Sequence, residues 1–223
     1  FAIQEVLVAL KTELELSGNE GMLVVDEEDA DRTDILFIAA NPLGNGQLNL
    51  DREVEDIENS LLRAKLRDQF TLHRLVATRP EDFLLRIRSL RPEFVHFSGH
   101  GEKEGIYMLD EYEQLMLVGH GEIEAFFKLQ KDLVRCVVLN ACFSESLARQ
   151  LCQYVKYVIG TMERVADQDA IEFSKLFYAA VGEGDDIPMA FKVARLNLMV
   201  NSRPGGIFRM CCRADENGGI ECV

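Results

Sequence analysis

The sequence predicts an α/β fold in which a mainly parallel sheet is covered by helices on both faces. Apolar segments of strand length alternate along the chain with longer segments of helical periodicity. Short loops join these segments, which is typical of parallel strands connected by helical crossovers. The segment 34–40 (DILFIAA) is apolar after its first residue, as a strand buried on both faces usually is.

In the first half of the chain, apolar runs set the strands, and charged residues or proline mark the helix ends. Acidic Asp51 and Glu53 open the first long helix and Arg67 closes it, as the helix dipole favours. Pro80 opens the second helix, because proline fits the first helical turn. The expected elements are a strand at 34–40, a helix at 50–66, a strand at 70–77, a helix at 80–90 and a strand at 93–98.

In the second half, turn and capping signals divide the chain. The polar segment 110–113 separates two short runs, which predicts a β-hairpin. Ser144 is expected to cap a helix, and Asp169 and Glu172 have the spacing of a capping box. The expected elements are hairpin strands at 105–109 and 114–118, a helix at 121–129, a strand at 133–139, a helix at 144–154, a strand at 156–160 and helices at 169–181 and 188–200.

Three regions are expected along the chain. Apolar residues recur at helical spacing between residues 3 and 14, so residues 1–33 are interpreted as an N-terminal helix and linker. Because the chain begins with Phe rather than Met, the alternative interpretation is the end of an upstream region. Residues 34–210 form the main domain. Residues 211–223 hold three of the six cysteines and a Gly-Gly pair, and we expect them to be a loose tail.

The composition argues against several classes of function. The net charge of -14 repels phosphate backbones, so no direct nucleic-acid partner is expected. No apolar run approaches the ~20 residues that cross a bilayer, and no signal peptide is visible, so no membrane partner is expected. None of the six cysteines forms a C-x-x-C zinc pair, and neither metal nor cofactor is expected. Their scattered placement favours a reducing cytoplasm.

Two reactive side chains follow predicted strands. His100 stands in residues 97–101 (FSGHG), and Cys142 stands in residues 137–144 (VVLNACFS), 42 positions later. Open α/β sheets build their sites where parallel strands end, so we expect the two side chains at one edge of one sheet. A cysteine beside a histidine suggests a thiol nucleophile with an imidazole base.

The chain resembles the CHAT family of bacterial caspase- and separase-like cysteine peptidases of clan CD over residues 34–200. This resemblance implies a caspase-like (caspase-hemoglobinase) fold, with His100 as the base and Cys142 as the nucleophile of a dyad. Family members often follow adaptor or helical-repeat domains and cleave a protein partner in bacterial defence or signalling. The matching segments are residues 35–42 (ILFIAANP), 50–54 (LDREV), 79–82 (RPED), 95–101 (VHFSGHG), 138–142 (VLNAC) and 158–160 (VIG), leading to Asp167.

The expected chemistry uses the thiolate, because a thiol is mostly protonated at pH 7. His100 takes the thiol proton and later protonates the leaving amine. Glycines at positions 99 and 101 leave room for a scissile carbonyl. By similarity to related peptidases, the backbone N–H groups of Gly101 and Cys142 would form the oxyanion hole. No third member of a triad is evident.

The sequence defines the substrate pocket less clearly than it defines the catalytic residues. In related clan members, the loop after the strand that follows the nucleophile helps to build the pocket for the residue before the cut. That loop is 161–167 here. Glu163 would favour a basic substrate residue, whereas Arg164 would favour an acidic one. Asp167 either lines the site or caps the next helix.

Two other functions stay open at this point. One is a catalytically silent caspase-like module that only binds protein partners, and it would have no need of both His100 and Cys142. The other is a nucleotide-binding flavodoxin-like domain with a phosphate at 41–46, although this segment lacks the G-x-G-x-x-G pattern. His96 is expected to be packed inside its strand and His120 to be a loop residue. The implied partners are a protein substrate and an upstream adaptor or activator.

Overall fold

The computed structural model describes residues 32–40, 49–76, 78–131, 133–213 and 219–223. The expected N-terminal helix and the candidate phosphate-binding segment 41–46 lie outside the described residues.

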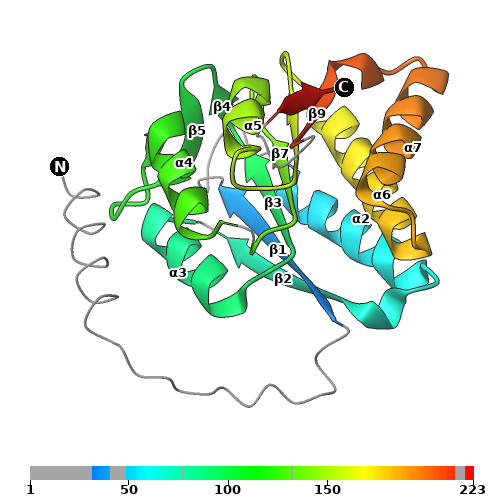
Figure 1. The fold of residues 1–223 in the computed structure, drawn as a ribbon, viewed down its shortest axis with the longest axis horizontal. Helices are drawn as coiled ribbons and strands as arrows, with labels where there is room; N and C mark the ends of the chain where they lie inside the picture. Colours follow the sequence, from blue (N-terminus) through cyan, green and yellow to red (C-terminus); the bar gives the residue numbers. More distant parts are fainter. Residues whose placement is uncertain (1–31, 41–48, 77, 132, 214–218) are drawn as a thin grey trace. The chain divides into compact units, whose positions relative to one another are not determined.

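A seven-stranded sheet forms the centre of the domain (Figure 1). Five neighbouring strands pair in parallel, and the last two strands at one edge each join the sheet by antiparallel pairing. This sheet confirms the predicted mainly parallel architecture. In spatial order the strands are β10 (Ile220–Cys222), β9 (Phe208–Arg213), β8 (Tyr157–Thr161), β7 (Cys136–Asn140), β3 (Phe94–Gly99), β1 (Thr33–Ala40) and β2 (Phe70–Val76).

Helices cover both faces of the sheet, as Figure 1 shows. One face carries α3 (Pro80–Leu90), α4 (His120–Leu129) and α5 (Glu145–Leu151). The other carries α2 (Leu50–Arg63), α6 (Asp167–Glu183) and α7 (Ile187–Val200). The central parallel strands β1, β3 and β7 are buried on both faces because each face is covered, whereas the edge strand β2 is only half-buried. Two 3-10 turns, η2 (Arg67–Gln69) and η3 (Gly205–Ile207), complete the helical elements of the described residues.

A second, three-stranded sheet contains β4 (Gly101–Glu102), β5 (Gly105–Leu109) and β6 (Leu115–Gly119). Strands β5 and β6 form the predicted antiparallel hairpin around the turn at 110–114. Strand β4 was not predicted, and it follows directly on the end of β3. The chain therefore leaves the main sheet at His100 and enters the small sheet one residue later.

Aromatic packing joins α6, α7 and β9 into one core. Phe173 of α6 stacks on Phe208 of β9, with ring centroids 4.1 Å apart. Phe191 of α7 meets Phe173 edge-on at 6.0 Å. Removing one buried aromatic side chain of this size typically lowers the free energy of unfolding by several kcal/mol. This cluster therefore anchors the antiparallel edge of the sheet.

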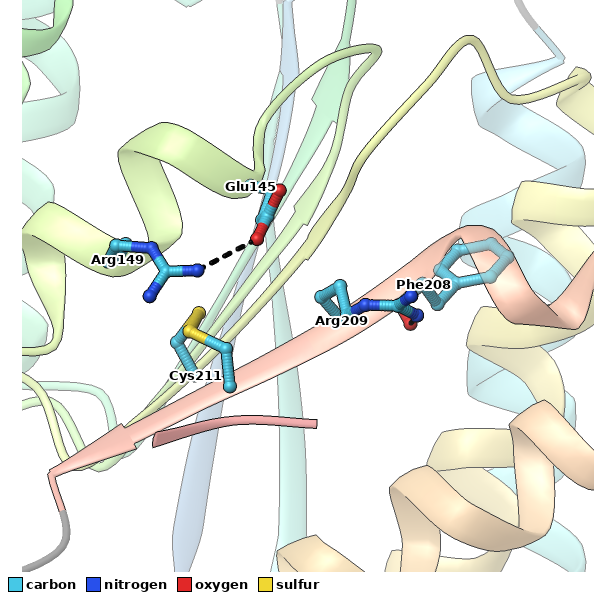
Figure 2. Close-up of a disulfide and its surroundings, with 6 residues drawn as sticks. Glu145, Arg149, Phe208, Arg209 and Cys211 are labelled. Carbon is cyan, nitrogen blue, oxygen red and sulfur yellow. Dashed lines mark hydrogen bonds and ion pairs between the residues drawn. A yellow bond between two sulfur atoms is a disulfide. The ribbon is translucent and has the colours of Figure 1, made fainter. Parts of the chain in front are cut away.

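The prediction of a loose tail after residue 210 is wrong. Strand β9 pairs antiparallel with β8, and β10 pairs antiparallel with β9. Cys211 and Cys222 stand opposite each other in this pairing and form a disulfide (Figure 2). Phe208 and Met210 are buried on one face of β9. The pairing of these cysteines depends on the register of the hairpin, which their spacing in the sequence does not reveal.

Several helix boundaries also differ from the prediction. Helix α6 begins at Asp167 rather than at 169, and the Asp169 carboxylate accepts a hydrogen bond from Arg203 (2.8 Å) instead of forming a capping box. His120 opens α4 and is not a loop residue. Ser144 stands before α5, but its hydroxyl donates to the Leu139 carbonyl and accepts from the Thr161 N–H. These hydroxyl contacts tie the start of α5 to β7 and β8.

We expect the Cys211–Cys222 disulfide to stabilise the domain by about 2–3 kcal/mol, because it closes a short loop in the unfolded chain. Under oxidising conditions, Cys222→Ser should lower the free energy of urea unfolding by that amount. The matched control is Cys212→Ser, which removes a neighbouring free cysteine. Wild-type stability that is the same with and without reductant would contradict this assignment.

Candidate active site

The register of two neighbouring strands brings His100 and Cys142 to the same level of the sheet. Strands β3 and β7 are parallel neighbours, and Ser98 pairs with Asn140. His100 lies two positions beyond Ser98, and Cys142 lies two positions beyond Asn140. The sequence separation of the two reactive residues therefore equals the register offset of the strands that deliver them.

The segment that follows His100 lies directly against Cys142. A Cβ atom added to Gly101 would lie 2.6 Å from the carbonyl oxygen of Cys142 and 3.2 Å from its backbone nitrogen. A side chain at position 101 would therefore force the two segments apart. Gly99 is similarly restricted, because a Cβ there would lie 2.9 Å from the Ala40 carbonyl oxygen. Both glycines are required by close backbone approach.

The turn that carries Cys142 has an unusual backbone. Phe143 adopts a φ of 57°, a left-handed conformation that bulky residues rarely take. Its N–H donates a hydrogen bond to the Glu163 carbonyl oxygen (3.3 Å). Cys142 itself is half-buried, and its Sγ lies 4.0 Å from the Val165 carbonyl oxygen. Strained turns of this kind concentrate at functional sites.

His100 and Cys142 stand between two cavities. The first, which we call the inner pocket, has a volume of about 150 Å³. The second, the outer groove, has a volume of about 810 Å³ and extends over the small sheet. The inner pocket is lined by Asn49, Leu50, Glu53, Ser98, Gly99, His100, Asn140, Ala141, Cys142, Val165, Asp167, Ala170 and Ile171. The outer groove is lined by His100, Gly101, Glu102, Lys103, Glu104, Tyr107, Leu115, Cys142, Phe143 and Arg164.

A buried carboxylate forms the base of the inner pocket. Glu53 of α2 is only 2% exposed. Its Oε1 accepts hydrogen bonds from His96 Nε2 (3.0 Å), Asn140 Nδ2 (2.5 Å) and Ser174 Oγ (2.8 Å). Its Oε2 accepts a hydrogen bond from Ser98 Oγ (2.5 Å). These four donors come from β3, β7 and α6, so one side chain joins three elements of the core.

The hydrogen bonds keep Glu53 ionised despite its burial. Burial by itself raises the pKa of this carboxyl, but the hydrogen bond and charge of His96 and the hydroxyls of Ser98 and Ser174 lower the pKa below its usual value. Tyr178, whose hydroxyl lies 3.3 Å from His96 Nδ1, has its pKa raised by burial and stays neutral. His96 is therefore a packed, hydrogen-bonded histidine, as predicted.

Sequence reasoning missed Glu53 as a site residue. It counted the residue among the acidic side chains that open a helix. The available signal was helical spacing, because Glu53 stands three positions after Leu50 and four before Ile57, both of which face the core. The strand partners have the matching pattern, since His96, Ser98 and Asn140 all occupy alternate, same-face positions.

The loop residues proposed to read the substrate occupy different places. Asp167 lines the inner pocket. Asp167 is the first residue of α6, whose N-cap position is Ala166 with no side-chain cap hydrogen bond, so Asp167 is not the cap. Arg164 lines the outer groove instead, and the exposed Glu163 lines neither cavity.

Within the described residues, no group of three or more His, Cys, Asp or Glu side chains is arranged to hold a metal ion. No helix of the described chain is both long enough and apolar enough to cross a bilayer.

No family model matches the chain. Two proteins have sequences similar to it. A "Probable protease" of Gillisia limnaea is 24% identical over 153 residues, which cover 67% of this chain and 27% of that protein. A "Roc-COR-CHAT protease" of Runella zeae is 24% identical over 148 residues, which cover 65% of this chain and 15% of that protein. The chain therefore spans less than a third of the length of either relative.

A solved structure has the same fold. It is a secreted C11 cysteine protease from Bacteroides thetaiotaomicron in complex with an irreversible peptide inhibitor, with a TM-score of 0.58 and 10% identity. The match covers 82% of this chain and 66% of that one. The fold is therefore caspase-like. Both relatives in sequence are named proteases, and the protein that shares the fold is a cysteine protease.

We expect a thiol reagent to distinguish Cys142 from the buried cysteines. Burial raises the pKa of Cys152 to about 12 and that of Cys136 further, so both remain protonated thiols. Cys142 is half-buried and faces both cavities. Iodoacetamide at pH 7.5 without reductant, followed by peptide mass mapping, should label Cys142 ahead of Cys136 and Cys152. Equal labelling of the three residues would contradict this accessibility.

Replacing the buried carboxylate should destabilise the fold. Glu53→Gln places an amide donor among hydrogen-bond donors, and we expect a loss of about 1–3 kcal/mol at pH 7. Because the folded pKa of Glu53 is lowered, its contribution is present above the unfolded pKa and is lost as the pH falls through the folded pKa. The difference between wild type and variant should therefore shrink in acid.

The control for this measurement is Glu55→Gln, an exposed position on the same helix, where a change within about 0.5 kcal/mol is expected. Urea titrations at several pH values measure both variants. A Glu53→Gln protein as stable as Glu55→Gln at neutral pH would show that the network contributes nothing.

Proposed function

We propose that the chain carries the catalytic domain of a CHAT-type cysteine endopeptidase, with His100 as base and Cys142 as nucleophile. The observation that carries this proposal is the β3–β7 register, which delivers both residues to the same level of one sheet edge. Both side chains also line the same two cavities. A substrate chain lying over the site would place its scissile carbonyl between the inner pocket and the outer groove.

The proposed reaction has two halves. His100 accepts the proton of Cys142, and the thiolate attacks the scissile carbonyl to form a tetrahedral intermediate. The backbone N–H groups of Gly101 and Cys142 are the proposed donors to its oxyanion, supported by the close approach of the two segments. His100 then protonates the leaving amine, and water hydrolyses the thioester.

A specific protein is the proposed substrate. The outer groove has a volume of about 810 Å³ and is lined by both acidic residues (Glu102 and Glu104) and basic residues (Lys103 and Arg164). Charges of both signs in one groove favour selection among partner sequences over general digestion. We further propose that the cleavage serves bacterial defence or signalling in the cytoplasm. The greater length of both relatives supports control by an adaptor or activator region outside this chain.

The direct test removes the nucleophile. We expect Cys142→Ala to reduce cleavage at least about 10³-fold, because the thiolate forms the covalent intermediate. The control is Cys212→Ala, which removes the other half-buried free cysteine. Purified proteins encoded beside the gene serve as substrates, and mass spectrometry maps each cut. Unchanged cleavage by Cys142→Ala would overturn the proposal, and binding of such a partner without any cut would favour a silent interaction module.

A further inference from the structure

We propose that the outward side of α7 is a docking surface for one amphipathic helix of a protein partner, with acidic residues beside its apolar stripe. This surface, which we call the α7 face, consists of five exposed apolar side chains. They are Met189, Val193, Leu196, Met199 and Val200. None of these five lines the inner pocket or the outer groove, so the inference goes beyond the proposed peptidase function.

Helix α7 is apolar on two opposite sides, whereas a helix at a protein surface normally has one apolar side. The five side chains of the α7 face are 39% to 74% exposed. The opposite side of the helix packs into the core through five other apolar residues, which are Ile187, Ala190, Phe191, Ala194 and Leu198. A helix of this composition is typical of a position that is covered on both sides. Exposed apolar patches on soluble proteins mark interaction sites.

The position of α7 leaves its outer side uncovered by the described part of the chain. Helix α6 packs against both α2 and α7, and Figure 1 shows α7 as the last helix of this layer. At the other end of the layer, the exposed residues of α2 are mostly charged, among them Arg52, Glu55 and Arg63. The apolar outer side is therefore a property of α7 and not of the whole layer.

The spacing of the α7 face favours a helix as the partner. Four of its side chains recur at intervals of four, three and four residues, which is the a/d spacing of a coiled-coil seam. They are Met189, Val193, Leu196 and Val200. Valine at the a positions, with methionine or leucine at the d positions, is the arrangement that favours a pair of helices. The seam is about 18 Å long, so a partner helix of about three turns would cover it.

The charges of α7 favour an acidic partner. The polar side chains of this helix are Lys192, Arg195 and Asn197, so α7 contains two cations and no carboxylate. The chain as a whole has a net charge of -14, so a purely basic helix stands out against its surroundings. Lys192 is exposed and occupies a g position beside the seam, where the charged residues of a coiled coil pair with those of the partner helix.

Arg195 is a second observation that points to an acidic partner. Its Nε is buried and has no hydrogen-bond partner among the described residues. Burial and the positive charge of Arg209 lower the pKa of Arg195. A partner carboxylate would accept hydrogen bonds from this guanidinium and offset the repulsion between the two arginines. Arg195 stands three positions after Lys192, so one acidic edge of a partner helix would face both cations.

Two other occupants fit the charges less well. A second copy of the chain would bring the same two cations and no carboxylate on its own α7. An anionic lipid surface would attract Lys192 and Arg195, but it would repel a chain with a net charge of -14. An acidic amphipathic helix satisfies both the seam and the two cations.

The first experiment measures the binding of synthetic peptides to the full chain by fluorescence anisotropy. Two helix-stapled peptides of about four turns share Val at the a positions and Leu at the d positions. They differ only at the flanking e and g positions, which are Glu in one peptide and Lys in the other. We expect the Glu peptide to bind about tenfold more tightly than the Lys peptide, and added salt should narrow this difference. No binding of either peptide, or equal binding of the two, would overturn the inference.

Variants of α7 test where the peptide binds. Leu196→Ser removes an apolar side chain from the seam and should weaken binding of the Glu peptide about tenfold. The control is Leu85→Ser, an exposed leucine of α3 on the opposite face of the sheet, which should bind as the wild type does. Because both leucines are exposed, the Tm of each variant should stay close to that of the wild type. Binding that is unchanged in Leu196→Ser would contradict the proposed location.

A charge reversal tests the acidic pairing. Lys192→Glu should reverse the preference, so that the Lys peptide binds more tightly than the Glu peptide. A Lys192→Glu protein that keeps the wild-type preference would overturn the acidic partner.

The second experiment tests the other two occupants with the same full chain. Analytical ultracentrifugation measures self-association, and co-sedimentation with vesicles of phosphatidylcholine and phosphatidylserine measures lipid binding. We expect Leu196→Ser to leave the oligomeric state unchanged, and we expect no binding to the vesicles. A dimer that Leu196→Ser dissociates, or vesicle binding that this variant abolishes, would overturn the inference in favour of a second copy or a membrane. Cys142→Ala should bind the Glu peptide as the wild type does, so failure of the peptidase proposal would leave this inference unaffected.

Discussion

The buried carboxylate of Glu53 is the interaction on which the rest of the site depends. Taking an ionised carboxylate out of water costs several kcal/mol unless hydrogen bonds replace the lost water. Here four donors from β3, β7 and α6 replace it. Satisfying one charge therefore requires α2 to dock over the β3–β7 pair and α6 to pack beside it. Two of the donors, Ser98 and Asn140, stand two positions before His100 and Cys142 on the same paired strands.

Much of this fold was predictable because its central parallel strands are buried on both faces. Runs such as those at 34–40 and 136–140 are apolar, and they alternate with helical segments that leave few other architectures. The placement of His100 and Cys142 at strand ends followed from the same pattern. The antiparallel edge did not, because the arginines and cysteines of β9 gave no continuous apolar run and its buried face became clear only from pairing with β8.

The inner pocket could be predicted only in part, since its residues come from distant segments. Asp167 was a candidate because the resemblance placed it near the site. Glu53 and Asn140 were not, because an acid in a first helical turn and an amide at a strand end each have an ordinary local explanation. Their contact with each other depends on the docking of α2 over the sheet. Local signals also misplaced the start of α6, where Asp169 pairs with Arg203 rather than capping the helix.

The C-terminal hairpin affects whether copies of this chain can associate through the edge of the main sheet. Strand β9 would otherwise present six residues of unpaired backbone at the edge of the main sheet, and β10 covers part of this edge with only three. A long open strand is a template for intermolecular β-pairing, whereas a short one is a poor template. The cross-strand disulfide holds this short cover in place. In reducing surroundings, where the bond opens, the cover would depend on its few backbone hydrogen bonds, and the sheet edge would become more prone to self-association.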